Sequence, residues 1–574
     1  MTLIEALERL KMPGPEGGRL RRVRLACGFT PLHLETFAAA HMRVADPTNQ
    51  VVIETGDYGD LAVQLETMAC ADLDTVLVVI EWADLDPRLG IRALGGWRPD
   101  DLTDILGTVR GQADRLAEAI GRIAATAVAV VAMPTLPIPP LFSTRSAQAG
   151  APEMALRGMV ATLGATLAAY PRVRMVCGQT IDTRSPLAER FDPRSALAAD
   201  FPYKLRHASF LAGTMSELAS PPAPKKGVIT DLDDTLWAGL LGEIGVDGIA
   251  WSLEQGAQLH GLYQQLLASL AAAGVLVGVA SKNDLGLVEQ AFGRRDLTLG
   301  IDAVFPIAAG WARKSQSVGQ ILEAWNIGPD AVVFIDDSPM EVAEVRSAFP
   351  EMECLIFPTG DARATFELLH RLRDLCGKTG RQKEDALRLA SLRAGEPFRL
   401  AQSEPGGASD GFLRAAAGAL EFELDGGVDD TRAFELINKT NQFNLNGRGL
   451  GEAAWRHHHG ADGAFMLTVG YRDKFGDLGK IGALLGRVAK DEVYVDAWVL
   501  SCRAFSRRIE HHCIKALFDH FSVKRITFDF VATPRNGPIQ SFLAGLTDLS
   551  AAKSPSFSRE GFFARAPAMF HSIA

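Results

Sequence analysis

The stretch GVITDLDDTLWAGLLGE, Gly227 to Glu243, places three acidic residues directly after a short apolar run. Asp231, Asp233 and Asp234 are so close together that their charges repel one another unless something neutralises them. Side chains alternate along an extended chain, so we expect Asp231 and Asp233 to point to the same side. A divalent cation would resolve the repulsion, and oxygen ligands of this kind suit Mg²⁺.

Further polar residues end or follow other apolar runs of the same region. Ser281 ends VLVGVAS, Lys314 follows in GWARKS, and Asp336 and Asp337 end AVVFIDD. Functional groups gather at the carboxyl edge of a parallel sheet, so these residues are expected to meet Asp231. One Asp can then attack phosphorus while another manages protons, and Lys314 offers a cation for the phosphoryl charge. The alternative is that the acids are helix caps and solvated turns.

These four motifs, in this order, resemble the haloacid dehalogenase (HAD) phosphatase superfamily. The resemblance implies that Asp231 is the nucleophile, that Asp233 is the general acid/base, and that Lys314 polarises the phosphoryl group. It also implies a Mg²⁺ site formed by Asp231, Asp233 (through its carbonyl) and Asp336. The substrate-binding residues of this region would be Thr235, Ser281, Lys282 and Asn283. Only about 45 residues separate Thr235 from Ser281, which leaves no room for a large cap domain.

Longer stretches narrow the resemblance to the FkbH family over nearly the whole chain. They are DLDDTLWAGLLGEIGVDGI, ASKND, FIDDSPMEVAEVR, INKTNQFNLNGR, RDKFGDLGKIG and SCRAFSRRIE. The resemblance implies transfer of a glyceryl unit from 1,3-bisphosphoglycerate to the phosphopantetheine thiol of an acyl carrier protein, with loss of phosphate, for polyketide and tetronate pathways. The departures are Asp234, where the family often has Asn, and AGLLGE in place of GGVVGE. Neither removes a catalytic group.

The alternation of strand-like and helix-like segments predicts an α/β protein of three domains. Expected strands lie at 23–29, 50–55, 74–82, 127–133 and 172–178, with helices at 98–125 and 153–170 between them. Strands that alternate with long helices predict a parallel sheet covered on both faces. The Pro-rich segment 220–226 and the charged segment around 378–405 mark the boundaries. We therefore expect an SGNH-hydrolase-like α/β domain at 1–225, a HAD-type Rossmann-like domain at 226–378 and a GNAT-like α+β acyltransferase domain at 379–574.

The N-terminal segment resembles the SGNH-hydrolase-like domain attached to some FkbH-type proteins. Such hydrolases need a nucleophilic Ser after the first strand, where CGFTPLH offers Thr30 at best. His207 stands alone in YKLRHASF. We expect a degenerate fold kept for packing or carrier docking; the alternative is a weak esterase that uses Thr30 and His207.

The C-terminal segment resembles a GNAT-type acyltransferase, although RAFSRRIE lacks the Gly that phosphate-binding loops prefer. Cys502 lies after a probable strand and at the start of a helix expected over 503–520. The helix N-terminus and Arg503, Arg507 and Arg508 would lower the pKa of its thiol. We predict Cys502 as a catalytic nucleophile and Arg503 as a substrate-binding residue. The alternative for Cys502 is a small buried residue.

Other polar residues of this segment have weaker signals. Asn441 and Asn444 of KTNQFN can orient a glyceryl hydroxyl or the pantetheine amide, or they can end a helix in a hydrogen-bonded turn. For Asp473 and Asp477 a structural turn is favoured over acid/base work. A solvated loop is favoured for 457–459 over a metal site. His511 and His512 are expected on the predicted helix, in a structural role.

The composition limits the partners and the compartment. A net charge of −10 on 574 residues excludes broad nucleic-acid binding, and no apolar run is long and unbroken enough for a membrane span. Seven Cys without a CxxC pair indicate reduced thiols, so we expect a cytoplasmic protein. Docking of an acidic acyl carrier protein would need a local basic patch, for which the candidates are Arg503, Arg507, Arg508, Lys524 and Arg525.

Three functions follow from these observations. The first is a Mg²⁺-dependent phosphatase with an aspartate nucleophile, coupled to glyceryl transfer onto a carrier thiol. The second is a plain HAD phosphatase that acts on a small-molecule phosphate, with structural flanking domains. The third is a non-catalytic scaffold for a biosynthetic assembly line, which the full set of Asp231, Asp233, Ser281, Lys314 and Asp336 argues against.

Overall fold

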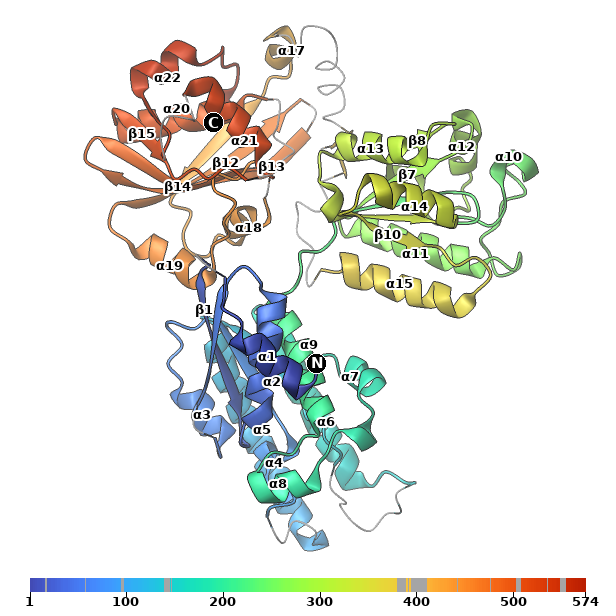
Figure 1. The fold of residues 1–574 in the computed structure, drawn as a ribbon, viewed down its shortest axis with the longest axis vertical. Coiled ribbons are helices and arrows are strands. Elements are labelled where there is room, and N and C mark those ends of the chain that lie inside the picture. The colour runs from blue at the N-terminus through green and yellow to red at the C-terminus, as the bar shows by residue number, and fades with distance from the viewer. Residues whose placement is uncertain are drawn as a thin grey trace. The chain divides into compact units, whose positions relative to one another are not determined.

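The computed structural model describes residues 1–574 except 16–17, 57, 94–97, 139–144, 146, 379–388, 391, 394–409, 441, 475, 502–506, 534, 548–553 and 574. The chain divides into two compact units, coloured from blue to red along the chain in Figure 1. The first comprises Met1–Pro222 with Gly451–Ala454, and the second comprises Ala223–Leu450 with Trp455–Ala574. The predicted boundary between a second and a third domain at 378/379 stays a prediction. No helix of the described residues is long and apolar enough to cross a membrane.

The first unit is a parallel sheet of five strands in the order β2-β1-β3-β4-β5, covered on both faces. Alternate residues of its central strands point to two different cores, so Leu77 and Val79 pack with α1, α2 and α9, while Val76 and Val78 pack with α3, α5 and α6. The strands are β1 (Leu20–Cys27), β2 (Gln50–Thr55), β3 (Thr75–Val79), β4 (Val128–Ala132) and β5 (Val173–Met175). The helices are α1 (Leu3–Lys11), α2 (Leu32–Ala45), α3 (Leu61–Thr67), α4 (Trp82–Leu85), α5 (Leu102–Ala124), α6 (Ala151–Ala168), α7 (Gly178–Arg184), α8 (Pro193–Ala199) and α9 (Leu205–Ala219).

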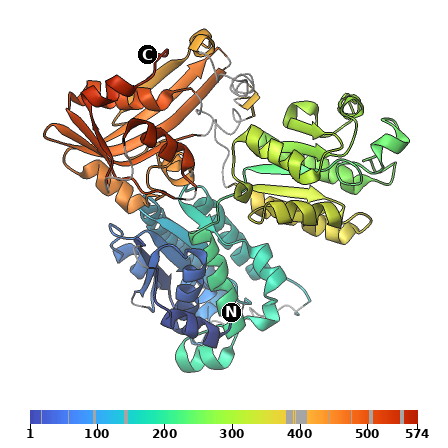
Figure 2. The ribbon, with the colours of Figure 1, turned by 45° about the horizontal axis from the view of Figure 1, so that its top comes forward.

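The second unit begins with another parallel sheet of five strands, in the order β10-β9-β6-β7-β8. Helices α11, α12 and α15 pack on one face and α13 and α14 on the other, a layering visible in green and yellow in Figures 1 and 2. The strands are β6 (Gly227–Thr230), β7 (Leu276–Ser281), β8 (Val304–Ala309), β9 (Val332–Asp336) and β10 (Glu353–Ile356). The helices are α10 (Leu241–Ile244), α11 (Gln258–Ala272), α12 (Leu285–Phe292), α13 (Lys314–Trp325), α14 (Pro339–Ala348) and α15 (Ala362–Cys376).

A third sheet follows, with seven strands in the order β16-β15-β14-β13-β12-β11-β17. Its pairs are antiparallel except for β14 with β15 and β11 with β17. Helices α20, α21 and α22 cover one face, and α18 packs on the other. The strands are β11 (Ala419–Leu424), β12 (Ala464–Asp473), β13 (Gly476–Ala489), β14 (Glu492–Leu500), β15 (Arg525–Phe528), β16 (Ser556–Ser558) and β17 (Ser572–Ile573). The helices are α17 (Asp410–Ala415), α18 (Thr431–Lys439), α19 (Glu452–Gly460), α20 (Ile509–Phe521), α21 (Gly537–Leu546) and α22 (Arg559–Arg565).

The predicted elements agree with the structure in the interior of the sheets and differ at their ends. The predicted strand 50–55 coincides with β2, and the helix expected over 153–170 is α6, two residues earlier at each end. The prediction of a solvated loop at 457–459 was wrong, because these residues belong to α19. There His459 packs edge-on against Trp455, with ring centroids 4.7 Å apart, and amphipathic packing of this kind favours a helix over a loop.

A buried Trp fixes the position of α13 on the sheet. Trp325, the last residue of this helix, is fully buried, and its indole N–H donates to the carbonyl of Phe305 at 2.7 Å. Its ring lies over two strand glycines: a Cβ added at Gly227 or Gly278 would come within 2.5 or 2.8 Å of ring carbons. Glycine is therefore required at both positions, because the atoms that an added Cβ would meet belong to the rigid, buried ring of Trp325.

Gly278→Ala is expected to destabilise this sheet by about 1–3 kcal/mol, because the added methyl group overpacks the contact with Trp325. Hydrogen exchange of peptides from β6 and β7 measures the effect locally. Gly319→Ala on α13 is the matched control, since its Cβ would lie 3.7 Å from the nearest atom and Ala favours a helix. Equal exchange rates in the two variants would contradict the prediction.

Candidate functional site

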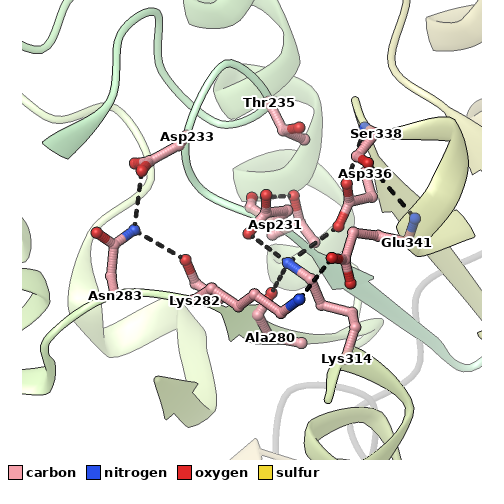
Figure 3. A network of polar contacts seen from close by, with 12 residues as sticks. Asp231, Asp233, Thr235, Ala280, Lys282, Asn283, Lys314, Asp336, Ser338 and Glu341 are labelled. Carbon is pink, nitrogen blue, oxygen red and sulfur yellow. Dashed lines mark hydrogen bonds and ion pairs between the residues drawn. The ribbon is translucent and has the colours of Figure 1, made fainter. Parts of the chain in front are cut away.

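The site lies at the carboxyl edge of the sheet β10-β9-β6-β7-β8. Parallel strands end at the same edge, so the residues that follow β6, β7 and β9 come together there. Asp231 follows β6, Ser281 ends β7 and Asp336 ends β9. Lys314 begins α13, the helix that follows β8. Figure 3 shows the side chains of Asp231, Lys314 and Asp336 converging, as expected from the sequence.

Lys314 is the centre of the site. Its ammonium group lies 2.9 Å from Asp231 Oδ1 and 3.0 Å from Asp336 Oδ2, and it donates to the carbonyl of Ala280 at 3.1 Å (Figure 3). Lys314 is only 3% exposed, and Asp336 is fully buried. A buried cation in contact with both carboxylates offsets the free-energy cost of burying them side by side.

The protonation of these groups follows from burial and from one another. Burial raises the pKa of Asp231 to about 7, an effect that Asp336 reinforces and Lys314 opposes. Burial disfavours the ammonium form of Lys314, but the carboxylates of Asp231 and Asp336 outweigh it and raise its pKa. Lys314 is therefore charged at neutral pH, and Asp231 is poised to lose its proton when further positive charge approaches.

Three carboxylates of this edge fit a divalent cation. Ligand atoms of Asp231, Asp336 and Asp337 all lie within 4.8 Å of one another. Asp231 Oδ1 and Asp336 Oδ2 are buried and, beyond their contact with Lys314, have no hydrogen-bond partner in the described part of the chain. Burial, and next the charge of Asp336, raises the pKa of Asp337. An all-oxygen set with this much repulsion suits Mg²⁺.

Thr235 supports this set. Its hydroxyl accepts a hydrogen bond from the backbone N–H of Asp337 at 3.0 Å, and the side chain is fully buried. Thr235 was predicted to bind substrate. That role stays a prediction; the structure shows that its hydroxyl also orients Asp337.

The expectation that Asp231 and Asp233 share one side of an extended chain was wrong, because β6 ends at Thr230. Asp234 has φ of 49° and accepts from the N–H of Gly239 at 2.7 Å, so it is a turn residue, as expected. Figure 3 shows the carboxylate of Asp233 directed towards Asn283, away from Lys314.

Asp233 has its own set of hydrogen-bond donors. Oδ1 accepts from the indole N–H of Trp237 at 3.1 Å and from the N–H of Leu241 at 3.2 Å, and Oδ2 accepts from Asn283 Nδ2 at 3.0 Å. Its carboxylate is therefore not part of the three-carboxylate set. The metal-binding role predicted for Asp233 concerns its carbonyl and stays a prediction.

The substrate-binding residues predicted after β7 divide into two kinds. Asn283 Nδ2 also donates to Ser281 Oγ at 3.1 Å, so these two buried side chains form one network with Asp233. Lys282 is instead paired with Glu341 at 2.6 Å at a more exposed position. Asn283 thus couples Ser281 to Asp233, while the substrate-binding role of Lys282 stays a prediction.

Two residues that support the site, Ser338 and Trp237, were not predicted from the sequence. The N–H of Ser338 donates to Asp336 Oδ1 at 2.9 Å, and its hydroxyl caps α14 by accepting from the N–H of Glu341. A Ser followed three residues later by Glu is a signal for such a cap and was available in DSPME. Nothing in the sequence signals the bond between Trp237 and Asp233.

Of the residues predicted for acyl transfer, the structure describes only Asn444. Asn441, Cys502 and Arg503 lie outside the described residues. Asn444 is buried, and its Oδ1 accepts from the backbone N–H groups of Asn446 and Gly447. Its side chain thus builds a turn, which favours the alternative over the predicted contact with substrate.

Two further predictions for this region change. Arg507 was expected in an exposed basic patch, but it is 4% exposed and lies 3.4 Å from the buried carboxylate of Asp473. Arg507 is therefore unavailable for docking, and Asp473 has a structural partner. Lys524 and Arg525 are exposed, as a docking patch requires.

The esterase alternative for the first unit fails on geometry. His207 is fully buried, and its ring nitrogens lie 2.9 Å from the hydroxyl groups of Thr135 and Ser185. Neither nitrogen is free for Thr30. Burial lowers the pKa of His207 to about 3, as expected for a neutral core histidine.

No protein-family model and no curated protein matches the chain. Among solved structures, the N-terminal part of protein BF1531 from Bacteroides fragilis, which contains a phosphatase domain and is complexed with Mg, is 18% identical, with a TM-score of 0.52. The match covers 66% of this chain and 100% of that one. At this identity the likeness shows the fold alone, and it confirms the expected α/β class with a parallel sheet.

Two other solved structures match with lower scores. Phospholipase A1 from Streptomyces albidoflavus is 12% identical over 36% of this chain and 100% of that one, with a TM-score of 0.27. An uncharacterized protein from Corynebacterium glutamicum is 17% identical over 27% of this chain and 98% of that one, with a TM-score of 0.19. Scores this low carry no argument, so the SGNH-like and GNAT-like assignments stay predictions.

Lys314→Ala is expected to destabilise this sheet by about 3–5 kcal/mol in EDTA at pH 7.5, because two carboxylates lose their buried counter-charge. Hydrogen exchange of peptides from β6 and β9 measures the loss. Lys282→Ala, whose pair with Glu341 is partly exposed, is the control and should cost about 1 kcal/mol or less. A Lys314 variant as stable as this control would show that the central ion pair does not hold the edge together.

Proposed function

We propose that the second unit contains a Mg²⁺-dependent phosphatase with Asp231 as the nucleophile. The observation that carries the proposal is the buried ion pair of Lys314 with Asp231 and Asp336 at the carboxyl edge of a HAD-type sheet. The likeness to the Bacteroides fragilis structure, which contains a phosphatase domain complexed with Mg, supports it.

The residues divide the chemistry as follows. A carboxylate oxygen of Asp231 forms a bond to phosphorus as the bond between phosphorus and the leaving oxygen breaks. Asp233 gives a proton to that oxygen and later takes one from the water that hydrolyses the aspartyl phosphate. Lys314 and the hydroxyl of Ser281 stabilise the charge on the phosphoryl oxygens. Bound Mg²⁺, held by Asp231, Asp336 and Asp337, would neutralise the remaining negative charge.

We further propose that this phosphatase serves glyceryl transfer from 1,3-bisphosphoglycerate to the phosphopantetheine thiol of an acyl carrier protein. The support is the resemblance to the FkbH family in INKTNQFNLNGR, RDKFGDLGKIG and SCRAFSRRIE, beyond the phosphatase motifs. In this proposal the Cys502 thiolate attacks the acyl carbon, and the bond from that carbon to the C1 phosphate breaks to release this phosphate. The Asp231 site hydrolyses the ester phosphate at C3, and the carrier thiolate then takes the glyceryl group as the bond to Cys502 breaks. The alternative is a plain phosphatase for a small-molecule phosphate.

Asp231→Asn should lower phosphatase activity on the order of 10³-fold or more, since an amide cannot attack phosphorus. Release of inorganic phosphate from p-nitrophenyl phosphate measures the loss. EDTA should abolish the wild-type activity and added Mg²⁺ should restore it. Asp302→Asn, at an exposed position, is the control and should retain full activity. An active Asp231→Asn enzyme would refute the nucleophile.

The transfer is tested with a phosphopantetheinylated carrier protein, Mg²⁺ and 1,3-bisphosphoglycerate generated in place, followed by intact mass of both proteins. A glyceryl adduct on the carrier is expected with the wild type, and Cys502→Ala should prevent it while leaving hydrolysis of p-nitrophenyl phosphate unchanged. Phosphate release without any adduct would leave the plain phosphatase as the function.

A further inference from the structure

The first unit contains a cavity of about 610 Å³, separate from the phosphatase site. It lies where the carboxyl ends of three parallel strands meet: Gly28 and Phe29 follow β1, Glu81 follows β3, and Leu136 follows β4. This edge is where parallel α/β sheets bind ligands, and the volume is ordinary for a small-molecule site.

The walls are mostly apolar, with three acidic residues, Glu81, Asp84 and Asp200. Glu81 accepts hydrogen bonds from Thr135 and Tyr203, and Asp200 pairs with Arg92, which leaves Asp84 as the acid with a free oxygen among them. Among the residues that line the cavity are Phe29, Trp82, Leu136 and Ile138. Asp84 Oδ2 accepts from the N–H of Glu81 at 2.7 Å, whereas Oδ1 accepts no hydrogen bond from the described residues.

Gly28 shows how closely this carboxyl group is held. A Cβ on Gly28 would lie 1.8 Å from Asp84 Oδ1, so any larger residue would displace the carboxyl group or fill its place. The end of β1 therefore leaves room for Asp84 at the point where the strand edge meets the cavity.

The surrounding charges favour a cation. Burial raises the pKa of Asp84 to about 8, and the nearby carboxylates of Glu81, Asp200 and Asp60 add to this effect. Among the described lining residues the cation is Arg92, and it lies 3.3 Å from Asp200, which it neutralises. A ligand anion would add to this repulsion, whereas an ammonium group would relieve it.

The cavity is built for binding and not for covalent chemistry. None of the described residues that line it is Ser, Thr, Cys, Lys or His. The nearby Cys27 points its thiol at the carbonyl of Phe29, at 3.2 Å, and burial with the charge of Asp84 raises its pKa so that it stays a neutral thiol.

We propose that this cavity binds a small organic amine, with its apolar body against Phe29, Trp82, Leu136 and Ile138 and its ammonium group on Asp84 Oδ1. The site is independent of the phosphatase chemistry, and its ligand is bound without being cleaved.

Three probes of one shape test the proposal by isothermal titration calorimetry: 1-naphthylmethylamine, 1-naphthalenemethanol and 1-naphthoate. The amine should bind the full-length protein at least about tenfold more tightly than the alcohol, because its hydrogen bond to the carboxylate is charge-assisted. The naphthoate should not bind. In Asp84→Asn the amine and the alcohol should bind with about equal affinity. Its amide oxygen can still accept from Glu81, so the variant is expected to fold. Asp72→Asn, an exposed acid of the same unit, is the control and should not change the preference.

Two further measurements separate binding in the cavity from attraction to an acidic surface. Ile138→Ala keeps every charge but removes apolar contact, and it should weaken the amine by about fourfold or more. Because Asp84 is mostly protonated below its pKa, amine affinity should fall by about tenfold per unit as the pH drops from 7 to 6. The proposal is overturned if the amine does not bind at millimolar concentration, if the alcohol or carboxylate binds equally well, or if Asp84→Asn or Ile138→Ala binds the amine like the wild type.

Discussion

The charged edge of the second unit's parallel sheet depends on one constraint, that two buried carboxylates and one buried ammonium group must be kept in contact. Asp231 and Asp336 belong to different strands, and Lys314 begins a helix that follows a third. Neither acid can be buried beside the other without the cation. The depth of α13 is set at its opposite end, where Trp325 lies on strand glycines. Packing more than ten residues away from Lys314 therefore fixes the geometry of the charges.

The two parallel sheets use the same edge in different ways. In the second unit, charged side chains occupy the edge: the buried ammonium group of Lys314 and three carboxylates that fit a metal ion. In the first unit the edge is open and apolar, with Asp84 facing a space of about 610 Å³. Topology fixes where functional groups meet, but the residues that follow each strand decide whether that edge is charged or apolar.

Sequence predicted the parts of the site that come directly after strands. Asp231, Ser281 and Asp336 were found because an apolar run followed by polar residues locates a strand end. The partners of these residues were not predictable, since they come from elsewhere in the chain: Thr235 meets Asp337 a hundred residues later. The prediction that Arg507 belongs to a docking patch was wrong for a related reason, because only the folded structure shows that its side chain is buried against Asp473.

Asp231 and Asp233 differ in the groups that contact their carboxylates, and this difference decides what each acid can do more than their spacing in the sequence does. Asp233 accepts hydrogen bonds at both oxygens, from Trp237, Leu241 and Asn283, so its carboxylate is fixed in orientation. The oxygen of Asp231 that faces Lys314 has no hydrogen-bond donor in the described chain beyond this ion pair. A carboxylate with few donors keeps its lone pairs for attack on an electrophile, whereas an oriented one suits directed proton transfer. Two of these donors, Trp237 and Leu241, lie on the segment that leaves the same strand and hold Oδ1, while Asn283, which follows β7, holds Oδ2, so two strand ends together orient this acid.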